Sequence, residues 1–418
     1  MSLFFTFTIF RSAIFRVGLP IVVVASLCLY CDNILAIVSP HSELMQISPY
    51  IMLPLVIFLS QPFNQGNSGL LAVVMLLGYY LIQNHLTFPL IAEVDKLSSW
   101  LIIIGLQLSL FVIHLLPERR LLSKSGVNFL LLLTLQLIIG FIAIKAISAA
   151  EIDLLWRTYL KPIEALSSSP YLLLMFSVLL TVTSFFVVVF RNDSSDHIVF
   201  TNLLFSTLCL YSFNTPVIPE LCFSLAATFM LVHIMTSSHE LAFVDQLTEL
   251  PGRRALEIEL KHLSGLYTIA MVDIDHFKHF NDNYGHRTGD EVLRLVSLLM
   301  SKVSGRAKIY RYGGEEFTIV IKGKNANQSM QYLNKIRSTI ENYDMVIRNH
   351  QQRPIIEPNF RLKISKPVDQ PTVNITVSIG VADSQNLLST EEVIKAADKA
   401  LYRAKSSGRN RVTNLRFA

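Results

Sequence analysis

The chain has 418 residues, of which 51% are hydrophobic and 16% are charged. Its net charge of +5 arises after residue 236: residues 1–236 carry 10 Lys or Arg and 11 Asp or Glu, whereas residues 237–418 carry 26 and 20. This mild positive charge suits an anionic ligand or a nearby membrane surface, but it is too weak to indicate nucleic-acid binding. The composition divides the chain into a lipid-compatible part and a soluble part of ordinary domain size.

Residues 1–236 are expected to form a multi-pass membrane region with an all-α transmembrane bundle. A helix needs about 20 apolar residues to cross the hydrocarbon core. Basic residues in the loops favour eight spans with both ends of the region on the cytoplasmic side. The second, third and seventh segments are short, so six or seven spans are alternatives. The predicted spans are 17–38, 46–62, 68–85, 98–116, 127–148, 170–191, 198–213 and 217–236.

The membrane region has few features that indicate a stimulus. Its loops are too short for a folded periplasmic sensor domain, so any stimulus would be detected in the bilayer or in these loops. Three polar residues, His85, His114 and Lys145, either mark a ligand site or extend from span ends to the interface, and we favour the second interpretation. The four cysteines all fall in this region and indicate no disulfide framework in the soluble part.

Residues 237–248 predict a short helical connector, and residues 249–418 predict an α/β domain. Strand-like and helix-like segments alternate around a central hairpin, which indicates a mixed, partly antiparallel sheet surrounded by helices. The expected strands are Tyr267–Asp273, Lys308–Tyr312, Phe317–Ile321, Val373–Ala382 and Asn410–Asn414. One helix is expected to follow the turn at 250–254 and to end near Leu263. Three further helices are expected at Asp290–Met300, Ser329–Tyr343 and Thr390–Ala404.

An insertion at about 344–371 interrupts this alternation. It is polar, contains four prolines and shows no clean periodicity. A loop of this length in a compact domain is either functional or a solvated extension, and we favour the second interpretation.

The most informative chemical motif is Arg-Tyr-Gly-Gly-Glu-Glu-Phe at residues 311–317. Two glycines between β-prone segments predict a tight hairpin turn whose backbone can approach a phosphate. Glu315 and Glu316 could then hold a divalent cation. The alternative is a solvated turn without a ligand.

Asp273 and Asp275 follow a buried strand, where carboxylates are costly unless a cation neutralises them. Magnesium takes oxygen ligands from one or two carboxylates and from phosphates, so it is a natural partner. A helix cap is the alternative role, which we expect for Asp275 but not for Asp273. Three further cations, Lys278, Lys405 and Arg409, could balance a polyphosphate.

Four separated motifs resemble the GGDEF family of diguanylate cyclases. They are the segment Asp273–Asp290, the Gly-Gly-Glu-Glu-Phe turn, the segment Ile375–Ala382 and the segment Ala404–Arg411. The segment Asp245–Arg254 is also similar to the start of that family's domain. The resemblance covers about residues 241–418 and implies a nucleotidyl-cyclase-like α/β fold.

The resemblance implies an enzyme that condenses two GTP molecules into cyclic di-GMP and two pyrophosphates. Each protomer of a homodimer would hold one GTP, with Mg²⁺ as cofactor and Mn²⁺ as an alternative. The family's usual setting implies a bacterial inner membrane with a cytoplasmic catalytic domain, cyclic di-GMP receptors as indirect partners and an output such as biofilm formation. No nucleic-acid partner is implied.

The resemblance also assigns roles to particular residues. The catalytic residues would be Asp273, Glu315 and Glu316, and the metal would be held by these three and by the Ile274 carbonyl. The guanine edge would be recognised by Asn281 and Asp290, because a carboxylate accepts hydrogen bonds from guanine N1–H and N2–H₂ that adenine lacks. The remaining substrate-binding residues would be Phe277, Lys278, Gly313, Gly314, Lys405 and Arg409.

Four positions depart from the family pattern. The family's product-inhibition site often has Arg and Asp where this chain has Ser304 and Ala307, and Arg306 is out of register. We therefore expect weak or absent product feedback. Gly252 stands in place of the usual Asn, and Glu315 in place of the commoner Asp retains a carboxylate.

Two other function classes are compatible with this sequence. A catalytically silent GGDEF domain would bind nucleotide or partners, but such domains usually lose an acid that this chain keeps. A transporter with a regulatory cyclase-like domain would need intramembrane charges or internal repeats, which are scarce in residues 1–236.

Overall fold

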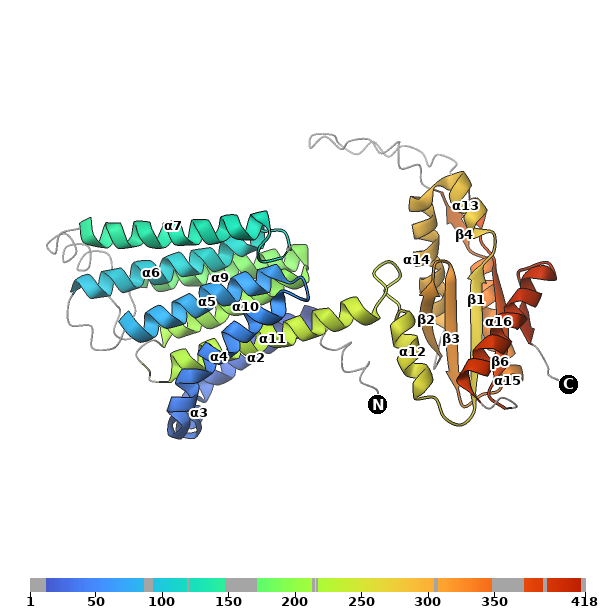
Figure 1. Ribbon diagram of the computed structural model, residues 1–418, viewed down its shortest axis with the longest axis horizontal. Helices are drawn as coiled ribbons and strands as arrows, with labels where there is room; N and C mark the ends of the chain where they lie inside the picture. The colour runs from blue at the N-terminus through green and yellow to red at the C-terminus, as the bar shows by residue number, and fades with distance from the viewer. Residues whose placement is uncertain are drawn as a thin grey trace. The chain divides into compact units, whose positions relative to one another are not determined.

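A computed structural model describes residues 13–85, 93–118, 120–146, 171–212, 215, 217–303, 307–347, 372–385 and 389–414. The chain divides into two compact units, Met1–Ser238 and His239–Ala418. The first unit is helical and the second combines a sheet with helices, as Figure 1 shows.

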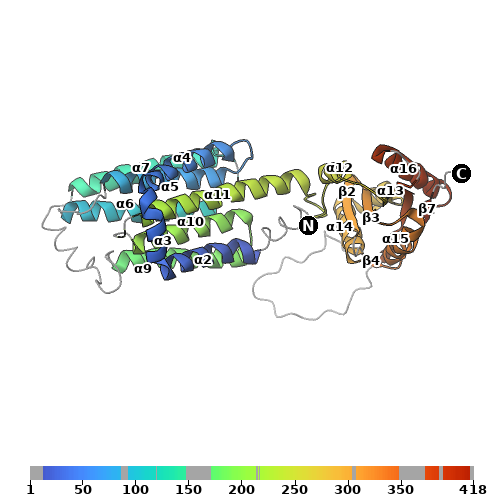
Figure 2. The ribbon, with the colours of Figure 1, turned by 90° about the horizontal axis from the view of Figure 1, so that it is seen from below.

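The N-terminal unit packs its helices around a core of aliphatic and aromatic side chains that includes Leu53, Tyr79, Phe205 and Met230. Most of these helices run side by side in Figures 1 and 2. Their bounds are α2 (Ala13–Leu29), α3 (Cys31–Val38), α4 (Ser42–Ser60), α5 (Gly66–His85), α6 (Glu93–Val112), α7 (Lys124–Ala146), α9 (Tyr171–Arg191), α10 (Ser194–Tyr211) and α11 (Ile218–Phe243), with short 3-10 helices at Ser39–His41 and Ile113–Leu115.

Four helical stretches of the described chain are long and apolar enough to cross a membrane. They are Cys31–Ser60, Gly66–Gln83, Tyr171–Arg191 and Ile218–Phe243. Helices of this length and hydropathy indicate membrane association. The count of eight spans stays a prediction.

From the sequence we expected His114 to reach toward the membrane interface. The structure shows instead that its side chain is buried inside the helical unit. It is 3% exposed, and its ring nitrogens lie 2.7 Å from Asp196 Oδ1 and 2.7 Å from Ser184 Oγ. Arg191 also lies 3.3 Å from the other oxygen of Asp196. The His114 ring can be buried because neighbouring helices supply hydrogen-bond partners for both of its nitrogens. The side chains of His85 and Lys145 lie outside the described residues.

Helix α11 continues through much of the predicted connector and ends at Phe243. Beyond it, Val244 pairs with Pro251 in an isolated antiparallel bridge. Asp245 accepts hydrogen bonds from the backbone N–H and the hydroxyl of Thr248, at 2.9 and 2.7 Å. The start of the C-terminal unit is therefore a closed turn that follows directly on α11.

The C-terminal unit contains a five-stranded sheet in the order β2-β3-β1-β6-β7. Strands β1, β2, β3 and β6 pair antiparallel, and β7 pairs parallel with β6. The sheet strands are β1 (Tyr267–Ile274), β2 (Lys308–Gly313), β3 (Glu316–Lys322), β6 (Val377–Asp383) and β7 (Val412–Asn414). The helices are α12 (Arg253–Lys261), α13 (Phe277–Tyr284), α14 (His286–Val303), α15 (Ala326–Glu341) and α16 (Thr390–Ser406).

Helices cover both faces of this sheet. Figure 2 shows α12 and α16 on one face and α14 and α15 on the other. Strand β1 is buried along its whole length and divides its side chains between the two sides. Ala270, Val272 and Ile274 join the core under α14 and α15, whereas Ile269 and Met271 join the core under α16. This alternation follows from the two-residue period of a strand.

One predicted strand, Val373–Ala382, is two strands in the structure. Residues Thr372–Asn374 form β5, which pairs with β4 (Asp344–Val346) in a separate two-stranded sheet. The break falls at Ile375–Thr376, where the Thr376 carbonyl accepts from the Asp275 N–H and its hydroxyl donates to the Asp275 carboxylate. These backbone and side-chain hydrogen bonds redirect the chain, and apolar periodicity cannot reveal them. Residues 348–371 of the predicted insertion lie outside the described residues.

Candidate active site

The two-residue period of β1 places Asp273 on the α16 side of the sheet. Asp273 is 5% exposed and lies opposite Glu316 of β3 in the strand register. Glu315 immediately precedes Glu316 in the hairpin turn between β2 and β3. Pairing of β1 with β3 therefore brings together the three carboxylates that the sequence indicated as catalytic.

The three carboxyl groups share an environment that disfavours their charge. Burial raises the pKa of Asp273, Glu315 and Glu316 above the usual values, and for both glutamates repulsion by Asp273 adds to the effect. Clusters of acids with raised pKa values are typical of sites that bind a cation or transfer protons.

Lys405 of α16 supplies the nearest positive charge. Its Nζ lies 2.8 Å from Asp273 Oδ2, and the lysine lowers the pKa of all three acids without fully offsetting their burial. We predicted a phosphate-binding role for this residue. That role stays a prediction, and in the structure the Lys405 ammonium group lies against Asp273 and neutralises its charge.

Close packing of α16 on β6 sets the position of Lys405. A Cβ atom on Gly380 would lie 2.0 Å from Leu401 N and 2.2 Å from Ala397 O, so the helix backbone rests directly on the strand. A side chain at residue 380 would force α16 away from the sheet. This glycine therefore controls the distance between Lys405 and Asp273.

The glycine turn is open on its outer side. No atom lies within 4 Å of a Cβ built on Gly313 or Gly314, and Gly314 has a φ of +49°, which favours glycine. A hollow of about 640 Å³ borders the turn and is also lined by Arg253, Arg254 and Arg311. The turn is therefore accessible to an anionic ligand, and the binding of one stays a prediction.

Arg311 fixes the turn to the start of the domain. Its guanidinium lies 2.7 Å from Asp245 Oδ1, and its Nη2 donates to the Gly314 carbonyl at 2.8 Å. Burial alone would raise the pKa of Asp245, but hydrogen bonds from Arg311 and Thr248 outweigh burial and lower that pKa. Arg311 was not among the residues expected at the site, although a basic residue two positions before the glycines was a signal that could have suggested it.

Asp275 does not cap α13, contrary to our expectation. Helix α13 begins after His276, which makes no side-chain capping bond. The Asp275 carboxylate accepts hydrogen bonds from Thr376 Oγ1 at 2.7 Å, from Ser378 Oγ at 2.6 Å and from the Asn410 N–H at 3.0 Å. It therefore anchors the segment that carries Arg409.

This segment adopts an unusual backbone. Gly408, Arg409 and Asn410 have φ values of +111°, +60° and +46°, which cost free energy for the two residues with side chains. The Asn410 side chain offsets this cost, because its amide donates to Glu341 at 2.6 Å and its oxygen accepts from Arg337 at 2.7 Å. Arg409 is thereby held near Asp273, whose pKa it lowers.

The predicted guanine-binding residues form a second group on α13 and α14. Asn281 Oδ1 is buried without a hydrogen-bond partner among the described residues, and a Cβ on Gly289 would lie 1.8 Å from it. Asp290 follows Gly289 and is exposed. Phe277 is 7% exposed and belongs to the core, so only its backbone could contact a ligand.

Lys278 is the predicted site residue that the structure does not connect to the others. It is exposed and makes no hydrogen bond or ion pair with any described residue. Ser304 and Arg306, at the predicted lost product site, lie outside the described residues, and Ala307 directly precedes β2.

The acidic cluster was tested for its fit to a divalent metal. No three Asp, Glu, His or Cys side chains of the described residues converge closely enough to hold a metal ion by themselves. Asp273, Ile274, Glu315 and Glu316 nevertheless supply the oxygen donors that magnesium prefers, and magnesium commonly takes its remaining ligands from phosphates. The residues fit an ion that binds together with a nucleotide.

Comparison with known proteins agrees with this geometry. Residues 242–357 and 355–411 match the family model "Diguanylate cyclase, GGDEF domain". The chain is 34% identical over 178 residues to the diguanylate cyclase VdcA of Vibrio cholerae, covering 42% of this chain and 47% of that protein. It is 34% identical over 198 residues to DgcZ of Escherichia coli, covering 46% and 58%.

The chain spans between 34% and 58% of the length of these and similar curated relatives. Among solved structures it is similar to the coiled coil and GGDEF domain of DgcB from Caulobacter crescentus in complex with c-di-GMP. The TM-score is 0.40 and the identity 29%, covering 49% of this chain and all of that one.

The match includes the acidic turn, the end of β1 and the Arg409 segment, all of which the strand pairing brings to the same end of the sheet. The C-terminal unit is a GGDEF domain of the kind found in diguanylate cyclases.

Proposed function

We propose that this protein is a membrane-bound diguanylate cyclase that condenses two GTP molecules into cyclic di-GMP and two pyrophosphates. The observation that carries the proposal is the group of Asp273, Glu315 and Glu316 around Lys405, beside an open glycine turn. The GGDEF match supports the same reaction.

In this proposal, nucleotide binding changes the partner of Lys405. The ammonium group balances Asp273 before a metal ion binds, and it moves to a phosphate when a nucleotide enters. A bound Mg²⁺ would neutralise phosphate charge and make the α-phosphate a better electrophile. Glu316 would orient the attacking 3′-hydroxyl and accept its proton, which its raised pKa favours.

The phosphates would bind along the turn and the Arg409 segment. Gly313 and Gly314 leave the backbone accessible, and Arg409 and Lys278 contribute positive charge. Asn281 and Asp290 would select guanine, since Asn281 Oδ1 lacks a hydrogen-bond partner in the described chain and the Asp290 carboxylate is accessible. Positioning and charge neutralisation account for most of the catalysis expected of such a site.

We further propose that the protein works as a homodimer in the bacterial inner membrane, with eight spans and a cytoplasmic catalytic domain. Each GGDEF domain would hold one GTP, so the reaction needs two domains facing each other. Helix α11 supports control by the membrane region, because the chain runs from its end at Phe243 directly to Asp245. Asp245 in turn forms an ion pair with Arg311, which holds the glycine turn. Inserting two to four residues after Ser237 should change basal turnover, and an unchanged rate would count against this coupling.

The reaction is tested by GTP turnover of the detergent-purified full-length protein with Mg²⁺, with the product identified by mass. Cyclic di-GMP from the wild type and from Glu391→Gln, but not from Glu316→Ala, is the expected result. Glu391 is an exposed acid in the first turn of α16 and serves as the matched control. Guanine nucleotide binding without product from any variant would identify a silent receptor instead.

A further inference from the structure

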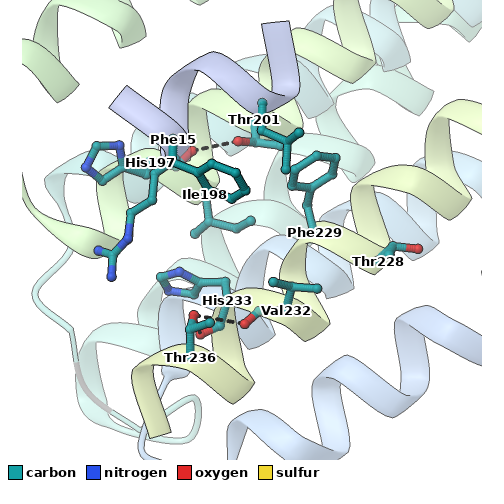
Figure 3. A pocket seen from close by; sticks show the side chains of 11 residues that line it. Phe15, His197, Ile198, Thr201, Thr228, Phe229, Val232, His233 and Thr236 are labelled. Carbon is teal, nitrogen blue, oxygen red and sulfur yellow. Dashed lines mark hydrogen bonds between the residues drawn. The ribbon is translucent and has the colours of Figure 1, made fainter. Parts of the chain in front are cut away.

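A cavity of about 200 Å³ lies among α2, α10 and α11 in the N-terminal unit. Phe15, Leu19, Ile198, Phe229 and Val232 make much of its wall apolar. In the view of Figure 3 the imidazole rings of His197 and His233 lie on one side of the cavity and the ring of Phe229 on the other. The cavity therefore has an apolar side and a polar side.

The polar side contains basic groups. His197 is 4% exposed, and its Nδ1 has no hydrogen-bond partner among the described residues. Arg16 also lines the cavity and interacts electrostatically with both His197 and His233. A buried ring nitrogen without a partner is costly unless a ligand or water satisfies it.

Of the two acids that interact electrostatically with His197, Asp196 is already engaged elsewhere. The carboxylate of Asp196 lies 2.7 Å from His114 Nδ1 and 3.3 Å from Arg191 Nε. Asp193, the other acid that interacts electrostatically with His197, is exposed at the residue before α10. The polar side of the cavity is thus better suited to a negative group than to a positive one.

The size of the cavity restricts its ligand. Pockets for drug-sized molecules measure about 300–1,000 Å³, so this cavity is too small for a nucleotide or a large cofactor. One short apolar chain with a compact head group matches both its volume and its two-sided lining.

We propose that the cavity binds a small amphiphile with one anionic group, whose head lies at Arg16, His197 and His233 and whose chain packs against Phe229 and Val232. A free medium-chain carboxylate and the head group of an anionic lipid share this chemistry. Since α11 supplies part of the wall, the site lies on the helix that leads to the GGDEF domain.

The test is equilibrium binding of radiolabelled decanoate to the full-length protein in phosphatidylcholine nanodiscs. We expect saturable binding that unlabelled decanoate displaces at least about tenfold better than the uncharged decanol, because a charge-assisted contact is lost with the alcohol. Arg16→Gln should raise the Kd about tenfold, and Val232→Phe, which fills the apolar side, should do the same. His41→Gln changes an exposed histidine outside the cavity and should have no effect.

Retained thermal stability of each variant shows that reduced binding is local. Nanodiscs containing phosphatidylglycerol separate the two sources: loss of decanoate binding there would identify the lipid head group as the occupant, and unchanged binding would identify the free acid. Equal displacement by decanol, full displacement by inorganic phosphate, or binding unaffected by both variants would overturn the proposal. The measurement does not depend on the proposed cyclase activity, so either can fail without the other.

Discussion

Asp273 and Asp275 lie two residues apart at the end of β1, and the structure treats them in opposite ways. Asp275 accepts hydrogen bonds from two hydroxyl groups and a backbone N–H, and these bonds hold β6 and the Arg409 segment together. Asp273 has the Lys405 ammonium group as its ion-pair partner and faces two further acids. The surroundings of Asp275 therefore stabilise the fold.

The surroundings of Asp273 destabilise the fold but leave a carboxylate able to bind a cation. A buried carboxylate with raised pKa destabilises the fold when it ionises, and a bound cation would relieve that cost. The comparison shows that burial at a strand end does not reveal the role of an acid. Its set of hydrogen-bond donors does.

The largest effect should come from Asp273→Asn. This change removes an ionisable ligand from the acidic cluster, so cyclic di-GMP formation should fall by about 10³-fold or more. The protein should melt at an equal or higher temperature, because a disfavoured charge is lost. Turnover and thermal unfolding, each compared with the exposed Asp282→Asn, check both parts. A protein that keeps normal turnover would remove Asp273 from the mechanism.

Asp275→Asn should reverse this pattern and primarily reduce stability. The amide nitrogen of asparagine donates and cannot accept, so at least one of the three donors loses its acceptor, and we expect a loss of about 1–3 kcal/mol. Hydrogen exchange followed by mass spectrometry should show faster exchange in β6 and β7 than in the wild type. Unchanged protection in these strands would show that Asp275 does not anchor the Arg409 segment.

Gly289→Ala should affect substrate affinity more than the chemical step. Its Cβ would displace Asn281, so the KM for GTP should rise about tenfold while kcat changes little. Gly140→Ala is the matched control, since a Cβ there meets no atom within 4 Å. Steady-state kinetics decide between the two parameters, and a fall in kcat alone would mean that Asn281 does not position GTP.

The smallest effect on stability should come from Glu315→Gln and should depend on pH. The folded-state pKa of Glu315 is raised, chiefly by burial, so the wild type is stabilised when this group is protonated and loses that stability as pH rises. The glutamine variant should therefore melt about 2 °C higher than the wild type at pH 7.5 and show no advantage near pH 4. The same advantage at both pH values would exclude a titration effect.

Much of the C-terminal fold could be predicted from local patterns. The hairpin of β2 and β3, the strand β1 and the helix α16 all lie where the sequence indicated. Apolar periodicity and a Gly-Gly turn specify these elements without reference to distant residues. The pattern did not predict that Val373–Ala382 would divide at Thr376, because the division depends on hydrogen bonds to Asp275, which lies far away in the sequence.

The prediction from local sequence that His114 extends to the membrane interface was also wrong. A polar residue near the end of an apolar segment usually reaches toward the interface, yet His114 finds Asp196 and Ser184 inside the helical unit. Partners that lie so far along the chain cannot be inferred from one segment.

The sequence by itself determined the chemical inventory of this protein: an apolar helical region, an α/β domain, three acids and a glycine turn. These follow from composition, period and residue chemistry, which are local properties. Only the tertiary structure decided that Lys405 meets Asp273, that Asp275 is structural and that Asn281 packs against Gly289. Those outcomes depend on how closely α16 approaches β6 at Gly380 and on which donors surround each carboxylate, and such contacts form between residues that are distant in the chain.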